Sequence, residues 1–276
     1  MIRLLALDLD DTLLGTDGRI SMENMRALEE ARAKGVRVTV VTGRRWIAAR
    51  PYVRQIRPEL PVICYCGAKV VHPETEKTEE LHLLPGRLVE RVLAFLAGTS
   101  HRYALYVDDL LYTEVWLTLP GRGPEEVPPG VHVVKSVPDA YRQLQAEQRN
   151  GVPVPQIDVF GAEAAEAVLT AFAGSGRTEA GVRLLPLRSE NLTYLKILPY
   201  AAEKGLALGR LCQRYGIEPG EVAAMGDSVL DAGMLRYAGV GVAMPWSGPE
   251  VKAAADLVME EGEPHPVAAA IRRLLS

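Results

Sequence analysis

The stretch LLALDLDDTLL, residues 4–14, is the part of the sequence on which the interpretation of the whole chain depends. An apolar run of strand length leads into two carboxylates at alternate positions, Asp8 and Asp10. In an extended chain these side chains would project the same way. Two like charges buried side by side are costly unless a cation or a shared proton relieves them. The stretch alone leaves two interpretations open, an ordinary aspartate-rich turn and a buried acidic site.

The composition is that of a globular protein with more than one domain. At 276 residues the chain exceeds a typical single domain, so we expect two domains or one domain with a large insertion. No segment reaches the roughly 18 to 20 uninterrupted apolar residues of a membrane span, so we expect a soluble protein. The net charge of −4 leaves no basic footprint for nucleic acid. We therefore expect a small-molecule substrate and neither a nucleic-acid nor a membrane partner, and no oligomeric state is predicted.

The cysteines bear on the cellular compartment. Cys64, Cys66 and Cys212 cannot all pair with one another, and no secretory apolar segment precedes the first strand. We therefore expect a cytoplasmic protein. Cys64 and Cys66 resemble half of a metal site, but no second pair at finger spacing exists and both lie in or beside an apolar run. Buried free thiols are the favoured interpretation.

The first 83 residues alternate between strand and helix patterns. After the opening strand, the spacing of apolar residues predicts a helix over 21–32, a strand over 36–41, a helix over 45–56, a strand over 62–66 and a hairpin over 69–83. Pro51 either kinks the second helix or marks its true start. The order is typical of an α/β fold with a doubly wound, mostly parallel, Rossmann-like sheet. Thr42-Gly43-Arg44 follows the second strand, at the sheet edge where such folds bind ligands.

The pattern changes over residues 84–197. Helices are predicted over 88–96, 140–148 and 163–173, strands over 103–107, 111–117, 156–160, 182–187 and 192–197, and a loop over 120–129. Helices and mostly antiparallel strands mix here without a βαβ order. We predict an inserted α+β cap domain over 84–197, within a core formed by 1–83 and 198–276.

After the insertion the first pattern resumes. A helix begins at Lys204-Gly205, and a short buried strand over 222–225 leads directly into Gly226-Asp227-Ser228, with Asp231 close behind. A strand over 240–244, a helix over 249–255, a strand over 257–259 and a helix over 267–274 complete the core. Acidic residues thus follow a buried strand a second time.

The polar residues at these strand ends form one predicted site. The carboxyl ends of parallel strands share one edge of the sheet, so distant parts of the sequence can meet there. Four carboxylates in a cleft favour a hard divalent cation, above all Mg²⁺. A lysine and a hydroxyl beside that cation suit a transferring phosphoryl group. The residues are Asp8, Asp10, Thr42, Lys204, Asp227 and Asp231.

With these motifs assembled, the chain resembles a haloacid dehalogenase superfamily phosphatase of the Cof type, whose α+β cap is inserted between the second and third motifs. The matching motifs are Asp8-x-Asp10-x-Thr12, Thr42-Gly43-Arg44, Lys204-Gly205 and Gly226-Asp227-Ser228 with Asp231. Each is weak alone. In this order, at strand ends and with the insertion in the expected gap, they are specific together.

The resemblance implies a role for each matching residue. Asp8 would be the nucleophile, and Asp10 the general acid and then the base. Thr42, Gly43, Arg44 and Lys204 would bind the phosphorylated substrate. Mg²⁺ would be held by Asp8, the backbone carbonyl of Asp10, Asp227 and Asp231. The implied activity is Mg²⁺-dependent hydrolysis of a sugar phosphate or cofactor phosphate through an aspartyl-phosphate, with the cap selecting the substrate.

Two departures from the family pattern concern substrate choice. Leu230 stands before Asp231 where an asparagine is usual, and Cys66 precedes Gly67 where an asparagine is usual. Both changes remove a polar group, so a catalytically silent phosphate-binding protein is the alternative from another functional class. A related phosphomutase is the nearest enzyme alternative, although the gap between Thr12 and Thr42 is short for its usual cap. A glycosyltransferase that uses a DxD metal site would leave Lys204 and the 226–231 block unexplained.

Overall fold

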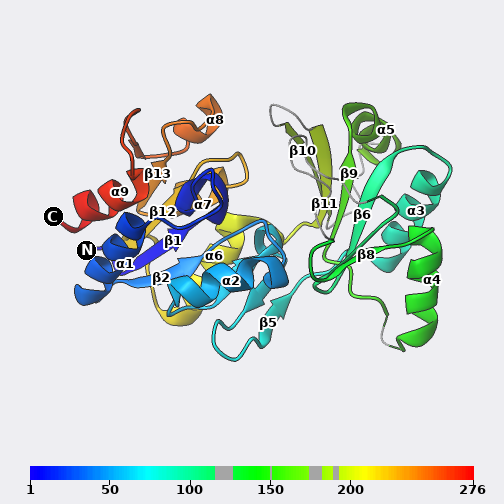
Figure 1. The fold of residues 1–276 in the computed structure, drawn as a ribbon, viewed down its shortest axis with the longest axis horizontal. Coiled ribbons are helices and arrows are strands. Elements are labelled where there is room, and N and C mark those ends of the chain that lie inside the picture. The colour runs from blue at the N-terminus through cyan, green and yellow to red at the C-terminus, as the bar shows by residue number, and fades with distance from the viewer. Residues whose placement is uncertain (116–126, 150, 174–181, 189–192) are drawn as a thin grey trace. The chain divides into compact units, whose positions relative to one another are not determined.

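The computed structural model describes residues 1–115, 127–149, 151–173, 182–188 and 193–276. The chain divides into two compact units, a core unit of Met1–Leu81 with Ala201–Ser276 and a cap unit of His82–Tyr200 (Figure 1). Among the described residues, no helix combines the length and the apolar character needed to cross a bilayer.

A parallel sheet forms the centre of the core unit. Its order is β14-β13-β12-β1-β2, and every neighbouring pair in it is parallel. The strands are β1 (Leu4–Leu7), β2 (Arg37–Val40), β12 (Val222–Gly226), β13 (Val240–Ala243) and β14 (Leu257–Val258). The chain first builds outward from β1 through β2 and later returns to build outward from β12. The switch point lies between β1 and β12, which is where open α/β sheets bind ligands.

A small antiparallel sheet extends this one beyond β2. It consists of β3 (Val62–Cys64), β4 (Lys69–Val71) and β5 (Thr78–Leu81), and a parallel bridge between Val41 and Ile63 joins it to β2. The strand predicted over 62–66 ends earlier than expected. Tyr65 and Cys66 adopt left-handed backbone conformations, with φ of 51° and 54°, and turn the chain into β4.

Helices cover both faces of the parallel sheet. They are α1 (Met22–Ala33), α2 (Trp46–Ile56), α6 (Lys204–Tyr215), α7 (Ala232–Tyr237), α8 (Pro249–Lys252) and α9 (Pro266–Leu275). Leu4 and Ala6 of β1 pack with buried residues of α6, α7 and α8. On the alternate positions Leu5 and Leu7 face the other way and are fully buried. Helices α1 and α9 pack against each other, and α1 contacts β2. Pro51 lies inside α2, so it does not mark the start of that helix.

The cap unit is a six-stranded sheet with helices on one face. Its order is β10-β11-β9-β6-β7-β8, and all pairs are antiparallel except β7 with β8. The elements are α3 (Gly86–Ala97), β6 (Arg102–Val107), β7 (Leu110–Thr113), β8 (Val131–Val133), α4 (Val137–Glu147), β9 (Gln156–Phe160), α5 (Ala162–Ala173), β10 (Val182–Arg188) and β11 (Thr193–Pro199). Buried side chains of α3, α4 and α5 form one apolar core with alternate strand residues such as Ile157 and Ile197.

The predicted fold class, a Rossmann-like α/β core with an α+β insertion, agrees with these two units. The predicted boundaries, after residues 83 and 197, lie near the change from one compact unit to the other, after residues 81 and 200. Most of the predicted loop over 120–129 lies outside the described residues. So do the end of the strand predicted over 111–117 and the start of the one predicted over 192–197.

Candidate active site

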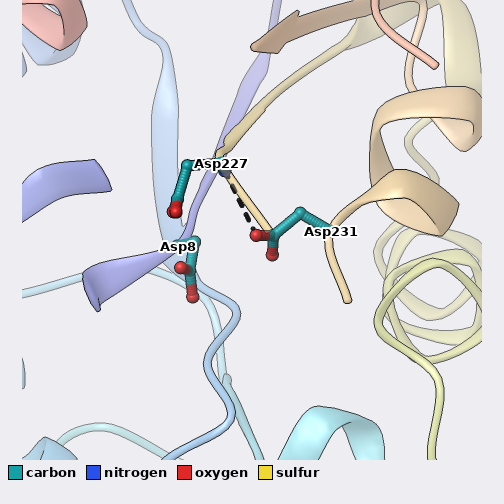
Figure 2. A group of neighbouring side chains, drawn as sticks. All are labelled: Asp8, Asp227 and Asp231. Carbon is teal, nitrogen blue, oxygen red and sulfur yellow. Dashed lines mark hydrogen bonds between the residues drawn. The ribbon is translucent and has the colours of Figure 1, made fainter. Parts of the chain in front are cut away.

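Three carboxylates meet at the switch point of the parallel sheet. Asp8 follows β1, Asp227 follows β12, and Asp231 lies just before α7. The backbone N–H of Asp8 donates to the carbonyl of Met225 at 3.0 Å, which continues the pairing of β1 with β12 up to the site. Figure 2 shows the three side chains converging, and one oxygen of each lies within 4.8 Å of the others.

The loop between Asp227 and Asp231 folds back on itself through one carboxylate oxygen. Asp231 Oδ2 accepts hydrogen bonds from the backbone N–H groups of Asp227, at 3.2 Å, and Ser228, at 2.9 Å, and from the Ser228 hydroxyl, at 2.9 Å (Figure 2 marks the first). A Cβ on Gly226 would lie 2.4 Å from the Cβ of Asp231. Only glycine at this position lets Asp231 approach the end of β12 so closely.

The ammonium of Lys204 lies among these acids. Lys204 is the first residue of α6, and its side chain is buried. Its Nζ donates to Asp8 Oδ1 at 2.7 Å and also to Asp231 Oδ1. The contacts join residues that are far apart in the sequence.

The site gathers three carboxyl groups around the single ammonium of Lys204. Burial raises the pKa of the Asp8 carboxyl well above its usual range, and the neighbouring charge of Asp231 raises it further. Burial also raises the pKa of Asp227 to about 7. Burial disfavours the charged form of Lys204, but Asp231 and Asp8 outweigh burial, so the pKa of Lys204 rises above its ordinary value. Carboxyls with raised pKa values around one ammonium favour a further cation.

The donor set of this group fits Mg²⁺. Mg²⁺ prefers oxygen ligands and is usually held by a few carboxylates together with water and substrate oxygens. Among the described residues, Asp8, Asp227 and Asp231 each offer such an oxygen within 4.8 Å of one another. The carboxylate of Asp10 is not one of this group.

Asp10 is instead paired with Arg44. After β1 the chain turns over Leu9–Leu13, where the backbone of Asp10 is extended and Asp11 adopts a φ of 54°. The strand therefore ends at Leu7. The expectation that Asp8 and Asp10 project the same way from one extended strand does not apply beyond that residue. Arg44 Nε donates to Asp10 Oδ2 at 2.8 Å and Arg44 Nη2 to Oδ1 at 2.5 Å. The predicted general acid and the predicted substrate-binding arginine thus contact each other.

Thr42 lies two residues after β2, the strand next to β1, and connects several of the loops. It is fully buried. Its N–H donates to the carbonyl of Ile63 at 2.8 Å, and its carbonyl accepts from the N–H of Cys66 at 3.1 Å. Its hydroxyl accepts from the N–H of Arg44 at 3.1 Å. A Cβ on Gly43 would lie 3.4 Å from Cys66 Sγ, so Cys66 packs against the predicted phosphate loop.

Two residues near the acids were given no role from the sequence. Thr12 is buried, and its hydroxyl donates to Asp227 Oδ1 at 2.7 Å. Glu203 precedes Lys204 and caps α6. Thr12 was visible only as part of motif one. An acid directly before the Lys-Gly pair at a predicted helix start was the available signal for Glu203.

The comparisons with known proteins agree with this geometry. A family profile described as haloacid dehalogenase-like hydrolase matches residues 5–271. Phosphatase YwpJ of Bacillus subtilis is 28% identical, over 99% of this chain and 100% of that protein. Pyridoxal phosphate phosphatase YbhA of Escherichia coli is 26% identical, over 96% of each. The solved structure of a haloacid dehalogenase-like hydrolase from B. subtilis has a TM-score of 0.80 and 25% identity, over 99% of this chain and 100% of that chain.

These similarities extend over almost the whole length of each protein, and they confirm the predicted family, fold class and enzyme class. The chain belongs to the haloacid dehalogenase-like hydrolase family and is a phosphatase hydrolase of that family.

Proposed function

We propose that the chain is a Mg²⁺-dependent phosphomonoesterase that acts on a small phosphorylated metabolite, a sugar phosphate or a cofactor phosphate, through an aspartyl-phosphate at Asp8. One observation carries the proposal. The carboxylates of Asp8, Asp227 and Asp231 converge at the switch point of the sheet, around the buried ammonium of Lys204. A phosphoryl group needs a nucleophile, a counter-charge and a metal within one small volume, and this cluster offers a residue for each.

Asp8 is the nucleophile in this proposal. One of its carboxylate oxygens attacks phosphorus, the bond between phosphorus and the leaving oxygen breaks, and the phosphoryl group is transferred to Asp8. Asp8 continues the line of β1, whose four residues are fully buried, so its backbone is fixed by the centre of the sheet. Such a rigid base favours an in-line approach.

Asp10 moves the protons in both halves of the reaction. It gives a proton to the leaving alkoxide in the first half, and in the second it takes a proton from the water that attacks phosphorus. That attack breaks the bond between phosphorus and Asp8 and releases inorganic phosphate. The carboxylate is half-exposed and held by Arg44, so water can reach it while its orientation stays fixed.

Lys204 and Thr42 bind the phosphoryl group. The Lys204 ammonium screens the charge between the nucleophile and the phosphoryl oxygens. The Thr42 hydroxyl and the loop of Gly43 and Arg44 donate hydrogen bonds to those oxygens. Mg²⁺, held by Asp8, Asp227, Asp231 and the backbone carbonyl of Asp10, would supply further neutralisation of the charge on the phosphoryl oxygens.

The cap domain, residues 84–197, selects the substrate in this proposal. Its sheet face opposite the helices carries a buried polar group in which Lys196 Nζ and Tyr106 donate to Asp158 at 3.3 Å and 3.0 Å. Gln156 Nε2 donates to the same carboxylate at 2.9 Å. The side chains of Gln156, Asp158 and Lys196 are buried and hydrogen-bond to one another. The E. coli relative is named for pyridoxal phosphate, a cofactor phosphate.

Release of inorganic phosphate tests the proposal. The native chain and Asp8→Asn would be assayed on phosphorylated sugars, nucleotides, flavin phosphate and pyridoxal phosphate, with Mg²⁺ and with a chelator. We expect hydrolysis by the native chain with Mg²⁺ alone. Activity that survives Asp8→Asn or chelation would contradict the mechanism. No hydrolysis of any substrate, together with retained phosphate binding, would favour the silent binding protein that Cys66 and Leu230 left open.

A further inference from the structure

The position of Lys204 poses an electrostatic problem. It is the first residue of α6 and is buried. The first N–H groups of a helix have no partner within the helix and present a partial positive charge. An ammonium is unfavourable at this end, and burial adds to the cost. The carboxylates of Asp8 and Asp231 offset the burial of the ammonium, and a further group is needed to offset the positive end of the helix.

Glu203 is placed to do so. Its backbone is extended, with φ −145° and ψ 130°, and its side chain caps α6. One carboxylate oxygen accepts from the N–H of Gly205 at 3.0 Å, and the other accepts from the N–H of Leu206 at 2.6 Å. The carboxylate therefore satisfies two of the helix's unpaired donors and places a negative charge beside the residue that carries the ammonium.

The space for the Glu203 side chain depends on two glycines. A Cβ on Gly233 of α7 would lie 1.8 Å from Glu203 Oε1 and 2.7 Å from its Cδ. A Cβ on Gly205 would lie 2.5 Å from the backbone of Gly233. Helix α7 starts directly after Asp231, which accepts from Lys204. The close packing at Gly233, which leaves space for the Glu203 carboxylate, thus also sets how closely α6 approaches α7, the helix that follows Asp231.

We propose that Glu203 is a positioning residue for Lys204. Its carboxylate fixes the first turn of α6 against Gly233 and offsets the positive helix end, which holds the ammonium of Lys204 between Asp8 and Asp231. The inference rests on the role proposed above for Lys204. Glu203 contacts backbone N–H groups and needs no contact with the substrate, so its effect on catalysis is indirect.

Side chains that separate capping from charge distinguish this role from plain helix stabilisation. Serine caps a helix without a charge, aspartate caps with a charge, and alanine does neither. Glu218 provides a matched control. It is the N-cap residue of the short helix Pro219–Glu221, which lies at the amino end of β12, away from the carboxylates. Each variant would be compared with the native chain for melting temperature, kcat and KM, on p-nitrophenyl phosphate with Mg²⁺.

The expected results differ between the variants. Glu203→Ala should lower the melting temperature by about 2 to 4 °C and lower kcat about 10-fold, while KM changes less than about 3-fold. Glu203→Ser should recover the melting temperature but not kcat, and Glu203→Asp should recover most of both. Glu218→Ala should leave kcat and KM at native values. Native kcat in Glu203→Ser would overturn the proposal, because capping alone would then suffice.

A second measurement separates this inference from the proposed function. Binding of inorganic phosphate, followed by calorimetry, requires a positioned Lys204 but no turnover. We expect Glu203→Ser and Gly233→Ala to weaken phosphate binding about 10-fold, in the direction of Lys204→Ala, and Glu218→Ala to bind as the native chain does. If the native chain hydrolysed nothing, the proposed function would fail, and the inference would be decided by phosphate binding. Native phosphate affinity in both Glu203→Ser and Gly233→Ala would overturn it.

Discussion

The guanidinium of Arg44 contacts both carboxylate oxygens of Asp10, with distances of 2.8 Å and 2.5 Å. Arg44 is itself held in place. Its Cζ lies 4.8 Å from the centre of the Tyr52 ring, and its backbone N–H donates to the Thr42 hydroxyl. Two-point contact fixes the plane of a carboxylate as well as its position. Arg44 therefore orients the residue proposed to move protons, in addition to any contact it makes with phosphate.

Arg44→Lys separates these two roles of the arginine. Lysine keeps the charge but cannot donate in a planar fork, so the orientation of Asp10 is lost. We expect kcat to fall about 10-fold, equivalent to about 1.4 kcal/mol, with little change in KM. Steady-state kinetics on the best substrate would measure this. The matched control is Arg54→Lys on α2, the helix that follows Arg44, where the arginine forms an ion pair with Glu76. A raised KM with native kcat would show instead that Arg44 binds substrate.

The raised pKa of Asp227 predicts that Mg²⁺ stabilises the protein more at higher pH. Burial moves this pKa from its ordinary value of 3.8 to about 7. The folded metal-free protein therefore holds this proton more tightly than the unfolded chain does. The resulting stability is present below the unfolded pKa and is lost as the pH rises through about 7. Mg²⁺ requires the ionised carboxylate, so its binding restores the stability that the protein loses when Asp227 is deprotonated.

We expect the rise in melting temperature on adding Mg²⁺ to be larger at pH 8 than at pH 6. Thermal unfolding at both pH values, with and without Mg²⁺, would measure it. In Asp227→Asn the rise should be small at both. Equal rises at the two pH values in the native chain would contradict the prediction.

The predicted site residues that the structure brings together are those whose signal in the sequence is local. A buried strand followed by acids marks Asp8 and Asp227, and the Lys-Gly pair at a helix start marks Lys204; contacts in the structure join these residues. The direction of Asp10 could not be predicted. It depends on the turn over Leu9–Leu13 and on a partner, Arg44, that another strand end supplies. Such tertiary contacts decide whether the chain continues as a strand or turns. The alternation of side chains along the sequence does not encode them.

Glu203 and Cys66 illustrate the same limit. The role proposed for Glu203 depends on the space that Gly233 leaves for its carboxylate. This space exists only once α6 and α7 have packed against each other. Cys66 ends an apolar run that predicts a strand. It adopts a φ of 54° instead, and its backbone N–H donates a hydrogen bond to the carbonyl of Thr42. Asparagine tolerates the left-handed region better than most residues do. The replacement of asparagine by cysteine thus carries a backbone cost as well as the loss of a polar group.

Lys204→Met should destabilise the metal-free protein. Methionine fills a similar volume but leaves the buried carboxylates of Asp8 and Asp231 without their ammonium partner. Breaking a buried ion pair from one side typically costs about 3 to 5 kcal/mol. Urea unfolding at neutral pH would measure the loss, and Mg²⁺ should restore part of it by neutralising the same acids. The control is Lys77→Met, since Lys77 is exposed. Native stability of Lys204→Met without metal would show that the acids are already neutralised in another way.

Thr12→Val should weaken Mg²⁺ binding without changing the shape of the site. The Thr12 hydroxyl donates to Asp227 Oδ1 at 2.7 Å and so orients a proposed metal ligand. Valine has nearly the same shape but no donor. Loss of a residue that orients a metal ligand commonly costs about 10-fold in affinity. Calorimetry with Mg²⁺ would measure this, and kcat at saturating Mg²⁺ should stay close to native. Thr16→Val, at an exposed position in the next turn, is the control. Native Mg²⁺ affinity with a reduced kcat at saturation would assign Thr12 to the phosphoryl group instead of the metal.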